Sequence, residues 1–239
     1  MTETLFLLDA YRKTAPGVVT GLTDEGGIIL DTSLFYARGG GQPGDSGMLD
    51  WAGGRIPVAT AVKGEGGQII LLPAEPAALP PVGASVEQRI DWDRRFGHMR
   101  SHTALHLLSV VIPLPVTGGA VGADKGRLDF NMPDAPEDKL VLQGRLNALI
   151  ERRLDVREDW ISEAELEANP GLVKTMSVQP PKGAGKIRLI RIGQGDGQVD
   201  LQPCGGTHVV NTGEIGKVTI GKIENKGRQN RRVTLVLDG

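Results

Sequence analysis

Residues 91–111, DWDRRFGHMRSHTALHLLSVV, decide how the 239-residue chain divides into parts. Asp91 and Asp93 are residue types that cap helices, and the stretch contains one glycine and no proline. We therefore expect a helix from Arg94 to Val111. Its core-facing side chains are expected to be Phe96, Met99, Leu105, Leu108 and Val111 or Ile112. The sequence before this helix differs in pattern from the sequence after it.

Residues 1 to about 88 consist of short apolar runs separated by glycine, proline and aspartate. Runs with this spacing and no convincing helix favour a small barrel or sandwich of strands. The expected strands include residues 5–8, 18–22, 27–31, 55–62 and 68–72. Four prolines within residues 73–81 indicate a stiff connector or loop near a domain boundary. The first predicted domain is therefore a β-barrel-like domain over residues 1–88.

After residue 88 the pattern mixes helices with strands, which indicates an α+β domain over residues 89–239. A second helix is expected over residues 136–154, with Asp134 as its candidate cap and a proline in its first turn. A third, short helix is expected to start at Ser162, because Ser162 and Glu165 have the spacing of a capping box. Strands are expected over residues 128–132, 187–192, 214–223 and 232–237.

Charge and composition narrow the functional classes. The net charge is −2, with −4 on residues 1–90 and +2 on the remainder, so a polyanion would meet only the second part. Aromatic residues make up 4% of the chain, which argues against a base-stacking RNA platform. A single cysteine excludes an internal disulfide and suits a reducing compartment. No segment has the pattern of a membrane span or a signal peptide, so we expect a cytoplasmic protein.

All four histidines and the only cysteine fall into two groups with the spacing of metal ligands. His98, His102 and His106 lie four residues apart on the expected helix, so neighbouring pairs project from one face. Cys204 and His208 flank Gly-Gly-Thr, whose glycines let both side chains point to one place. Zinc favours nitrogen and thiolate ligands in sets of four. The sequence therefore predicts a zinc site, and the spacing alone leaves the helical pair as either 98/102 or 102/106.

A glycine-rich segment over residues 35–47, FYARGGGQPGDSG, contains a formal GxGxxG pattern. No helix is expected to follow it, and it lacks the Gly-Lys-Ser/Thr of a phosphate-binding loop, so it does not predict a nucleotide site. Two interpretations remain open. The segment is either a sharp loop between two strands or a loop whose bare backbone and Gln42 and Asp45 side chains approach a substrate.

The densest basic run covers residues 222–232, with five basic residues and one acidic residue. Such runs are often simply solvated surface. Here asparagine and glutamine are interleaved with the charges, a mixture suited to phosphate and sugar contacts. The candidate RNA-binding residues are Lys222, Lys226, Arg228, Arg231 and Arg232. Contacts of this kind predict salt-sensitive binding.

Four motifs carry a resemblance over nearly the whole chain: His102-Thr-Ala-Leu-His106, Cys204-Gly-Gly-Thr-His208, the glycine-rich segment and the basic run. Together they resemble the freestanding alanyl-tRNA editing proteins of the AlaX family, in their medium-length form, and the editing domain of alanyl-tRNA synthetase. The resemblance implies a β-barrel-like N-terminal domain and a C-terminal editing domain. It also implies hydrolysis of the ester joining serine, with glycine as a second candidate, to tRNA(Ala). Zinc would be held by His102, His106, Cys204 and His208, and His98 matches no family ligand.

The chemistry that the resemblance implies leaves two residue roles open. A synthetase pocket for alanine cannot strongly reject serine, but a separate hydrolytic site can select for the hydroxyl. Thr103 is the candidate to bond that hydroxyl, and the alternative is a bond to its own helix backbone. Four protein ligands close a tetrahedron, so zinc would position the substrate or have one loose ligand. In a further alternative Asp200, the nearest carboxylate, is the catalytic base that activates a free water.

Two other classes of protein are compatible with the same sequence. One is a zinc-stabilised RNA-binding module without hydrolysis, in which the metal only holds the domain together. The other is a zinc hydrolase of a different small ester or amide, for which the basic run would be irrelevant.

Overall fold

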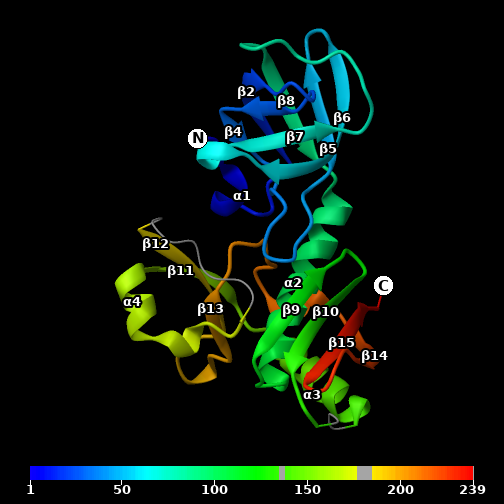
Figure 1. Ribbon diagram of the computed structural model, residues 1–239, viewed down its shortest axis with the longest axis vertical. Coiled ribbons are helices and arrows are strands. Elements are labelled where there is room, and N and C mark those ends of the chain that lie inside the picture. The colour runs from blue at the N-terminus through cyan, green and yellow to red at the C-terminus, as the bar shows by residue number, and fades with distance from the viewer. Residues whose placement is uncertain (135–137, 177–184, 239) are drawn as a thin grey trace. The chain divides into compact units, whose positions relative to one another are not determined.

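The computed structural model describes residues 1–134, 138–176 and 185–238. The chain separates into two compact units, Met1–Phe96 and Gly97–Gly239 (Figure 1). The division falls inside helix α2 (Trp92–Val111), so one helix belongs to both units. The predicted division at residues 88 and 89 stays a prediction. No helix in the described ranges is both long and apolar enough to cross a membrane.

The first unit contains a closed barrel, which confirms the predicted class for this region (Figure 1). Neighbouring strands pair antiparallel in the order β2-β3-β7-β6-β5-β8. Their bounds are β2 (Thr14–Leu22), β3 (Ile28–Leu30), β5 (Gly47–Trp51), β6 (Gly54–Lys63), β7 (Ile69–Pro73) and β8 (Ser85–Ile90), with a 3-10 turn at Glu65–Gly67. Alternate residues of β2, Ala15, Gly17 and Val19, are buried, as a period of two requires. The proline-rich stretch after β7 is a loop that leads into β8.

One predicted strand is wrong. Leu5–Leu8 forms the short helix α1 and not a strand. It directly follows β1 (Glu3–Thr4), which pairs in parallel with β4 (Thr32–Ser33). Four consecutive apolar residues carry no alternation, so the pattern did not distinguish strand from helix. A helical turn buries the adjacent residues Leu5 and Phe6 together, whereas a strand would send them to opposite faces. Phe6 then packs edge-on against Tyr36, with ring centroids 5.3 Å apart.

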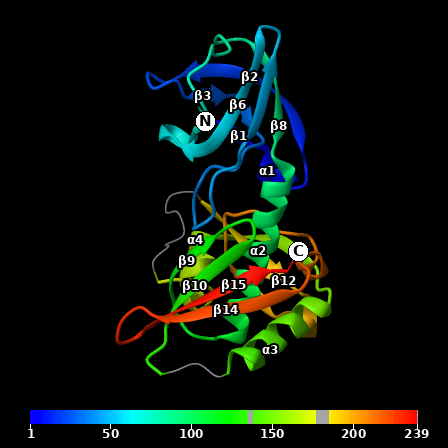
Figure 2. The same cartoon turned by 90° about the vertical axis from the view of Figure 1, so that its right-hand side faces the viewer.

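The second unit contains two antiparallel sheets, ordered β14-β15-β10-β9 and β11-β12-β13 (Figure 1). Figure 2 shows the four-stranded sheet. The strands are β9 (Val116–Val121), β10 (Lys125–Asn131), β11 (Val156–Ser162), β12 (Lys186–Ile192), β13 (Asp200–Pro203), β14 (Val218–Asn225) and β15 (Asn230–Leu237). Besides most of α2, the helices are α3 (Lys139–Glu151) and α4 (Glu163–Ala168), with short 3-10 turns at Pro170–Leu172, Gly195–Gly197 and Thr212–Ile215. This mixture of helices and antiparallel strands is the α+β character that the sequence predicted.

The core of the second unit lies along α2 and α3. Met99, Leu105 and Leu108 of α2 are buried as predicted, with Ile112 beyond the helix end, whereas Phe96 is half-buried. Phe96 instead stacks on Trp92, with ring centroids 5.4 Å apart. Helix α3 buries the row Leu142, Leu146 and Ile150 and packs against β14.

Some predicted boundaries in the second unit need correction. Asp138, and not Asp134, caps α3 by accepting a hydrogen bond from Leu140 N. The helix therefore begins later in the chain than predicted. The predicted start at Pro136 lies outside the described residues. The helix stops three residues before Leu154, and Arg153 turns the chain with a positive φ of 52°. Glu214 belongs to the 3-10 turn before β14. The capping box at α4 is confirmed, with both reciprocal bonds between Ser162 and Glu165 present.

Candidate metal centre

Four side chains from distant parts of the second unit converge on one point. His102 and His106 lie on α2, and Cys204 and His208 lie on the loop that follows β13. One ligand atom from each lies within 4.8 Å of the others. Cys204 Sγ is 3.3 Å from His208 Nε2 and 3.5 Å from His102 Nε2. Among the described residues, this is the one group of histidine, cysteine and carboxylate side chains with the spacing of a metal site.

The structure resolves which helical pair belongs to the cluster. The imidazole rings of His102 and His106 are 5.4 Å apart, and the ring of His208 is 4.4 and 4.7 Å from them. His98, one turn earlier on α2, is 2% exposed and does not belong to the group. The 102/106 alternative is therefore the one that the structure brings together.

Asp200 fixes the orientation of His106. Its Oδ2 lies 2.9 Å from His106 Nδ1, which leaves Nε2 of that ring for the centre of the cluster. The same carboxylate accepts hydrogen bonds from Lys174 Nζ and, at 2.8 Å, from Gln202 Nε2. Asp200 is 3% exposed. The structure therefore places the predicted catalytic base behind a cluster histidine, where its contacts orient that ring.

Thr103 is the corresponding partner of His208. Its hydroxyl Oγ1 is 3.1 Å from His208 Nδ1, donates to Met99 O at 2.9 Å and accepts from Val209 N at 3.3 Å. A hydroxyl has one donor and two acceptor sites, so these three bonds use its full capacity when His208 Nδ1 carries the proton. The bond to Met99 O is the backbone bond that the alternative interpretation of Thr103 predicted. Its role in binding a serine hydroxyl stays a prediction.

The side chains of the cluster strongly perturb one another. Burial raises the pKa of the Cys204 thiol, but the His102 and His208 charges and hydrogen bonds from His102 and His106 outweigh it, so the pKa falls well below its usual value. For His106, burial opposes the charge, but the hydrogen bonds to Asp200 and Cys204 raise the pKa to about 9. Burial and the charge of His102 lower the pKa of His208 to about 3. The shifts of Cys204 and His208 favour a thiolate and a neutral imidazole, the forms that bind metals, whereas His106 would have to release a proton when a metal binds.

The donor set is suited to a metal ion. Three imidazoles and a thiolate form a four-membered set of nitrogen and sulfur donors. His106 and His208 each use Nδ1 for a hydrogen bond to a neighbouring side chain, which fixes the tautomer that leaves Nε2 available. The residues present therefore fit a divalent metal with a preference for tetrahedral nitrogen and sulfur ligands.

Two residues predicted to approach a substrate from the glycine-rich segment are buried in the first unit. Gln42 is 0% and Asp45 1% exposed. Asp45 forms an ion pair with Arg95 and accepts from Tyr36 N at 2.6 Å. A Cβ at Gly44 would lie 2.2 Å from Ala61 O, which explains the glycine there. The segment is a loop between β4 and β5, and a substrate contact stays a prediction.

The five predicted RNA-binding residues lie on the hairpin of β14 and β15. Arg232 is held by Asp129 through two bonds of 2.8 and 2.9 Å, and Lys222 and Lys226 lie 3.4 and 3.6 Å from Glu224. Arg231 donates to two carbonyl oxygens of the hairpin and to Pro133 O. Arg228 is exposed in the turn between the strands. The positive charge of the hairpin is therefore partly neutralised by Asp129 and Glu224.

Sequence analysis missed two cationic residues beside the cluster. Lys174 reaches Asp200, and Arg188 on β12 is buried behind the loop of Cys204. Arg188 gave one clue, because it interrupts the apolar run KIRLIRI of a strand that is otherwise mostly buried. The sequence around Lys174 has no pattern that would have indicated its contact with Asp200.

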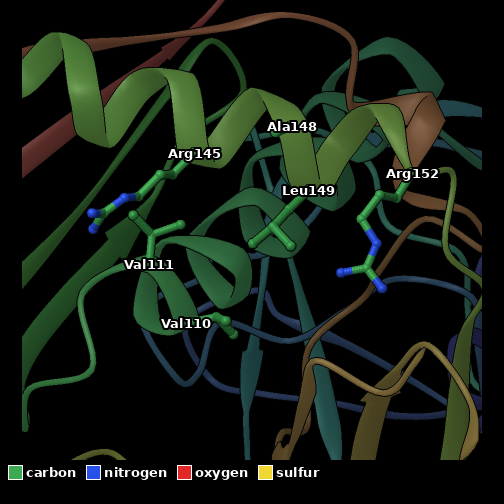
Figure 3. A pocket seen from close by; sticks show the side chains of 6 residues that line it. All are labelled: Val110, Val111, Arg145, Ala148, Leu149 and Arg152. Carbon is green, nitrogen blue, oxygen red and sulfur yellow. The ribbon is translucent and has the colours of Figure 1, made fainter. Parts of the chain in front are cut away.

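A separate pocket of about 400 Å³ lies between the end of α2 and α3 (Figure 3). The lining residues are Val110, Val111, Arg145, Ala148, Leu149 and Arg152. None of the predicted site residues is among them, so the pocket belongs to no site that the sequence indicated.

Comparison with known proteins gives the class first. The profile of the threonyl and alanyl tRNA synthetase second additional domain matches residues 187–234, which include most of β12, Cys204, His208 and most of the basic hairpin. The profile of the class II (A) tRNA synthetases matches residues 8–94, which cover the barrel. The chain is thus related to parts of tRNA synthetases, and the two profiles fall on different units.

Full-length relatives give the family. The chain is 34% identical to the alanyl-tRNA editing protein AlaX-M of Methanosarcina acetivorans, with 99% of each chain aligned, and 35% identical to that of Saccharolobus solfataricus, with 98% of each aligned. The protein belongs to this AlaX-M family of alanyl-tRNA editing proteins. It is also 35% identical to the alanine–tRNA ligase of Pyrobaculum aerophilum over 93% of this chain, which is 25% of that much longer enzyme.

Proposed function

We propose that the protein is a trans-editing hydrolase that removes serine, with glycine as a second candidate, from mischarged tRNA(Ala). The observation that carries this proposal is the convergence of His102, His106, Cys204 and His208 in a chain whose full-length relatives are named as alanyl-tRNA editing proteins. The reaction is the attack of water on the ester carbonyl that joins the amino acid to the terminal ribose. It releases the free amino acid and intact tRNA.

We propose zinc as the metal, because three imidazoles and one thiolate match its preferred ligands. When bound, zinc would supply a Lewis acid that holds and orients the aminoacyl group next to the scissile ester. The chain itself contributes a preorganised ligand set, in which Asp200 orients His106 and Thr103 orients His208.

Two alternative roles for Asp200, catalytic base or positioning residue for His106, can be distinguished within this proposal. As a catalytic base it would take a proton from the attacking water. Its carboxylate already accepts from His106, Lys174 and Gln202, and these contacts support a role in holding His106. Hydrogen bonds to His106 and the charge of Lys174 outweigh burial and keep the pKa of Asp200 low, which disfavours proton uptake.

We propose that the hairpin of β14 and β15 binds tRNA through Lys222, Lys226, Arg228, Arg231 and Arg232. The residues lie on two paired strands and their turn, so their charges are on one element. Because Asp129 and Glu224 neutralise part of this charge, we expect a modest number of phosphate contacts. Binding should weaken steeply with salt.

The experiment is the release of serine from Ser-tRNA(Ala), with Ala-tRNA(Ala) in parallel as the matched substrate. We expect rapid loss of serine with alanine retained. Loss of both amino acids would indicate a deacylase without the proposed selectivity. Protein that contains zinc, binds the tRNA and leaves both esters intact would contradict hydrolysis and favour an RNA-binding module.

A second arm uses a variant with Arg228, Arg231 and Arg232 changed to alanine. We expect its rate on Ser-tRNA(Ala) to fall and to depend less on salt. An unchanged rate at all salt concentrations would favour a small ester as the substrate, because the hairpin would then be irrelevant.

A further inference from the structure

A buried arginine lies directly behind the loop that carries Cys204 and His208. Arg188, on β12, is 8% exposed. Its Nη1 donates to Cys204 O at 2.9 Å and to Gly206 O at 2.8 Å, and Cys204 N donates to Arg188 O at 3.1 Å. The side chain and the backbone of one residue therefore bind both ends of the Cys204-Gly205-Gly206 turn.

A second strand fixes the arginine. Its Nη2 forms an ion pair with Glu158 of β11, the neighbouring strand in the sheet. A planar guanidinium with two anchored nitrogens has little freedom to rotate. The pairing with Glu158 therefore holds the guanidinium in a fixed orientation for its bonds to the loop carbonyls.

The loop needs such a support because of its own sequence. Two consecutive glycines have the greatest backbone freedom of any pair of residues, and a Cβ at Gly205 would meet nothing within 4 Å. The loop nevertheless supplies two of the four cluster side chains. Gly206 N also donates to Cys204 Sγ at 3.4 Å, a contact that depends on the same turn.

We propose that Arg188 is a positioning residue that holds the Cys204-Gly205-Gly206 turn in its metal-binding conformation. It reaches the metal site only through the loop carbonyls. The proposal rests on the metal centre of the proposed function and not on its tRNA substrate. The fixed turn reduces the conformational freedom that metal binding would otherwise have to remove, so loss of Arg188 should weaken metal binding without removing a ligand.

The test is Co²⁺ binding followed by absorption, because thiolate-to-cobalt charge transfer reports directly on Cys204. Arg188→Met should bind Co²⁺ about 10- to 100-fold more weakly than the wild type, the usual effect of losing a partner of the ligands. Arg188→Lys retains the charge and the stem, so it serves if the methionine variant fails to fold. It should bind Co²⁺ at least about 10-fold more weakly, because an ammonium cannot reproduce the fork on two carbonyls.

The matched control is Arg191→Met. Arg191 lies on the same strand and pairs with Asp159 of β11 as Arg188 pairs with Glu158, but its side chain bonds to Asp159 and Gln198 and not to the loop. We expect wild-type Co²⁺ affinity and an unchanged charge-transfer band in this control. Folded Arg188 variants with wild-type affinity and spectrum would overturn the role of Arg188. Wild-type protein that binds no Co²⁺ would overturn the metal centre itself, and the two failures are thus distinguishable.

Discussion

Two glycine-containing loops, one in each unit, are both held by a buried arginine that binds two backbone carbonyls and one carboxylate. In the barrel unit, Arg95 donates to Ala10 O and Leu34 O and pairs with Asp45. In the second unit, Arg188 donates to two loop carbonyls and pairs with Glu158. Arg95 holds its loop through the Asp45 carboxylate, whereas Arg188 holds its loop through the two carbonyls. The exposure of the two ion pairs also differs. The Arg95 and Asp45 side chains are 0% and 1% exposed, whereas the Glu158 side chain is 36% exposed.

The two loops also differ in where their polar side chains lie. In the barrel unit two polar side chains of the loop, Gln42 and Asp45, are buried, and Arg38 is exposed. In the second unit the polar side chains, Cys204 and His208, converge with two histidines of a helix. An ion pair with one solvent-exposed partner costs little to form, so that anchor can serve orientation without dominating folding.

The largest effect should come from breaking the barrel anchor. Asp45→Ala leaves the guanidinium of Arg95 buried without its counterion, which should cost about 3–5 kcal/mol of unfolding free energy. The matched change Glu158→Ala should cost about 1 kcal/mol or less, because that carboxylate is partly solvated. Urea unfolding of the full chain, followed by hydrogen exchange of barrel amides and of β12 amides, measures both. Equal costs for the two variants would remove the distinction between the anchors.

The next largest effect should come from a change in the loop that carries Cys204 and His208. Cys204→Ser replaces the thiolate by a hydroxyl that is a poor zinc ligand, so metal affinity should fall by more than about 100-fold. Barrel amides should keep wild-type protection, because this residue belongs to the second unit. Competition with a chromophoric chelator measures the affinity. Wild-type affinity in the serine variant would show that the thiolate is not a ligand.

A smaller effect should follow from the carboxylate behind His106. Asp200→Asn keeps an oxygen for the imidazole but loses the negative charge, so metal affinity should fall by about 10-fold. Asp196→Asn, an exposed change in the preceding 3-10 turn, is the control and should bind metal normally. If Asp200→Asn bound zinc normally and still lost serine release, Asp200 would act as the catalytic base.

The smallest effect should be a pH dependence at the hairpin. Hydrogen bonds from Arg232 and Arg127 outweigh burial and lower the pKa of Asp129. Its contribution to stability is therefore present above the ordinary aspartate pKa and is lost as the pH falls through the lowered value. Asp129→Asn should cost about 1 kcal/mol at pH 7 and progressively less at acid pH. A constant difference from the wild type between pH 7 and pH 2 would exclude this linkage.

Features with a local sequence pattern could be predicted, whereas contacts between distant residues could not. Cys204 and His208, with the i, i+4 spacing of His102 and His106, predicted the cluster because metal ligands need specific residue types at specific spacings. The barrel followed from short apolar runs separated by glycine, proline and aspartate, because such spacing is typical of short strands joined by turns. The run at residues 5–8 was assigned wrongly because it has no period. Arg188 and Lys174 could not be assigned, because their partners lie 16 to 30 residues away and depend on strand register.

The most direct test of zinc-dependent editing is the rate of serine release from Ser-tRNA(Ala) before zinc removal, after it and after zinc is returned. We predict that the rate is lost with the metal and recovers in proportion to bound zinc, up to one ion per chain, while circular dichroism shows that the fold persists. Full serine release by folded protein without metal would contradict a role of zinc in the reaction.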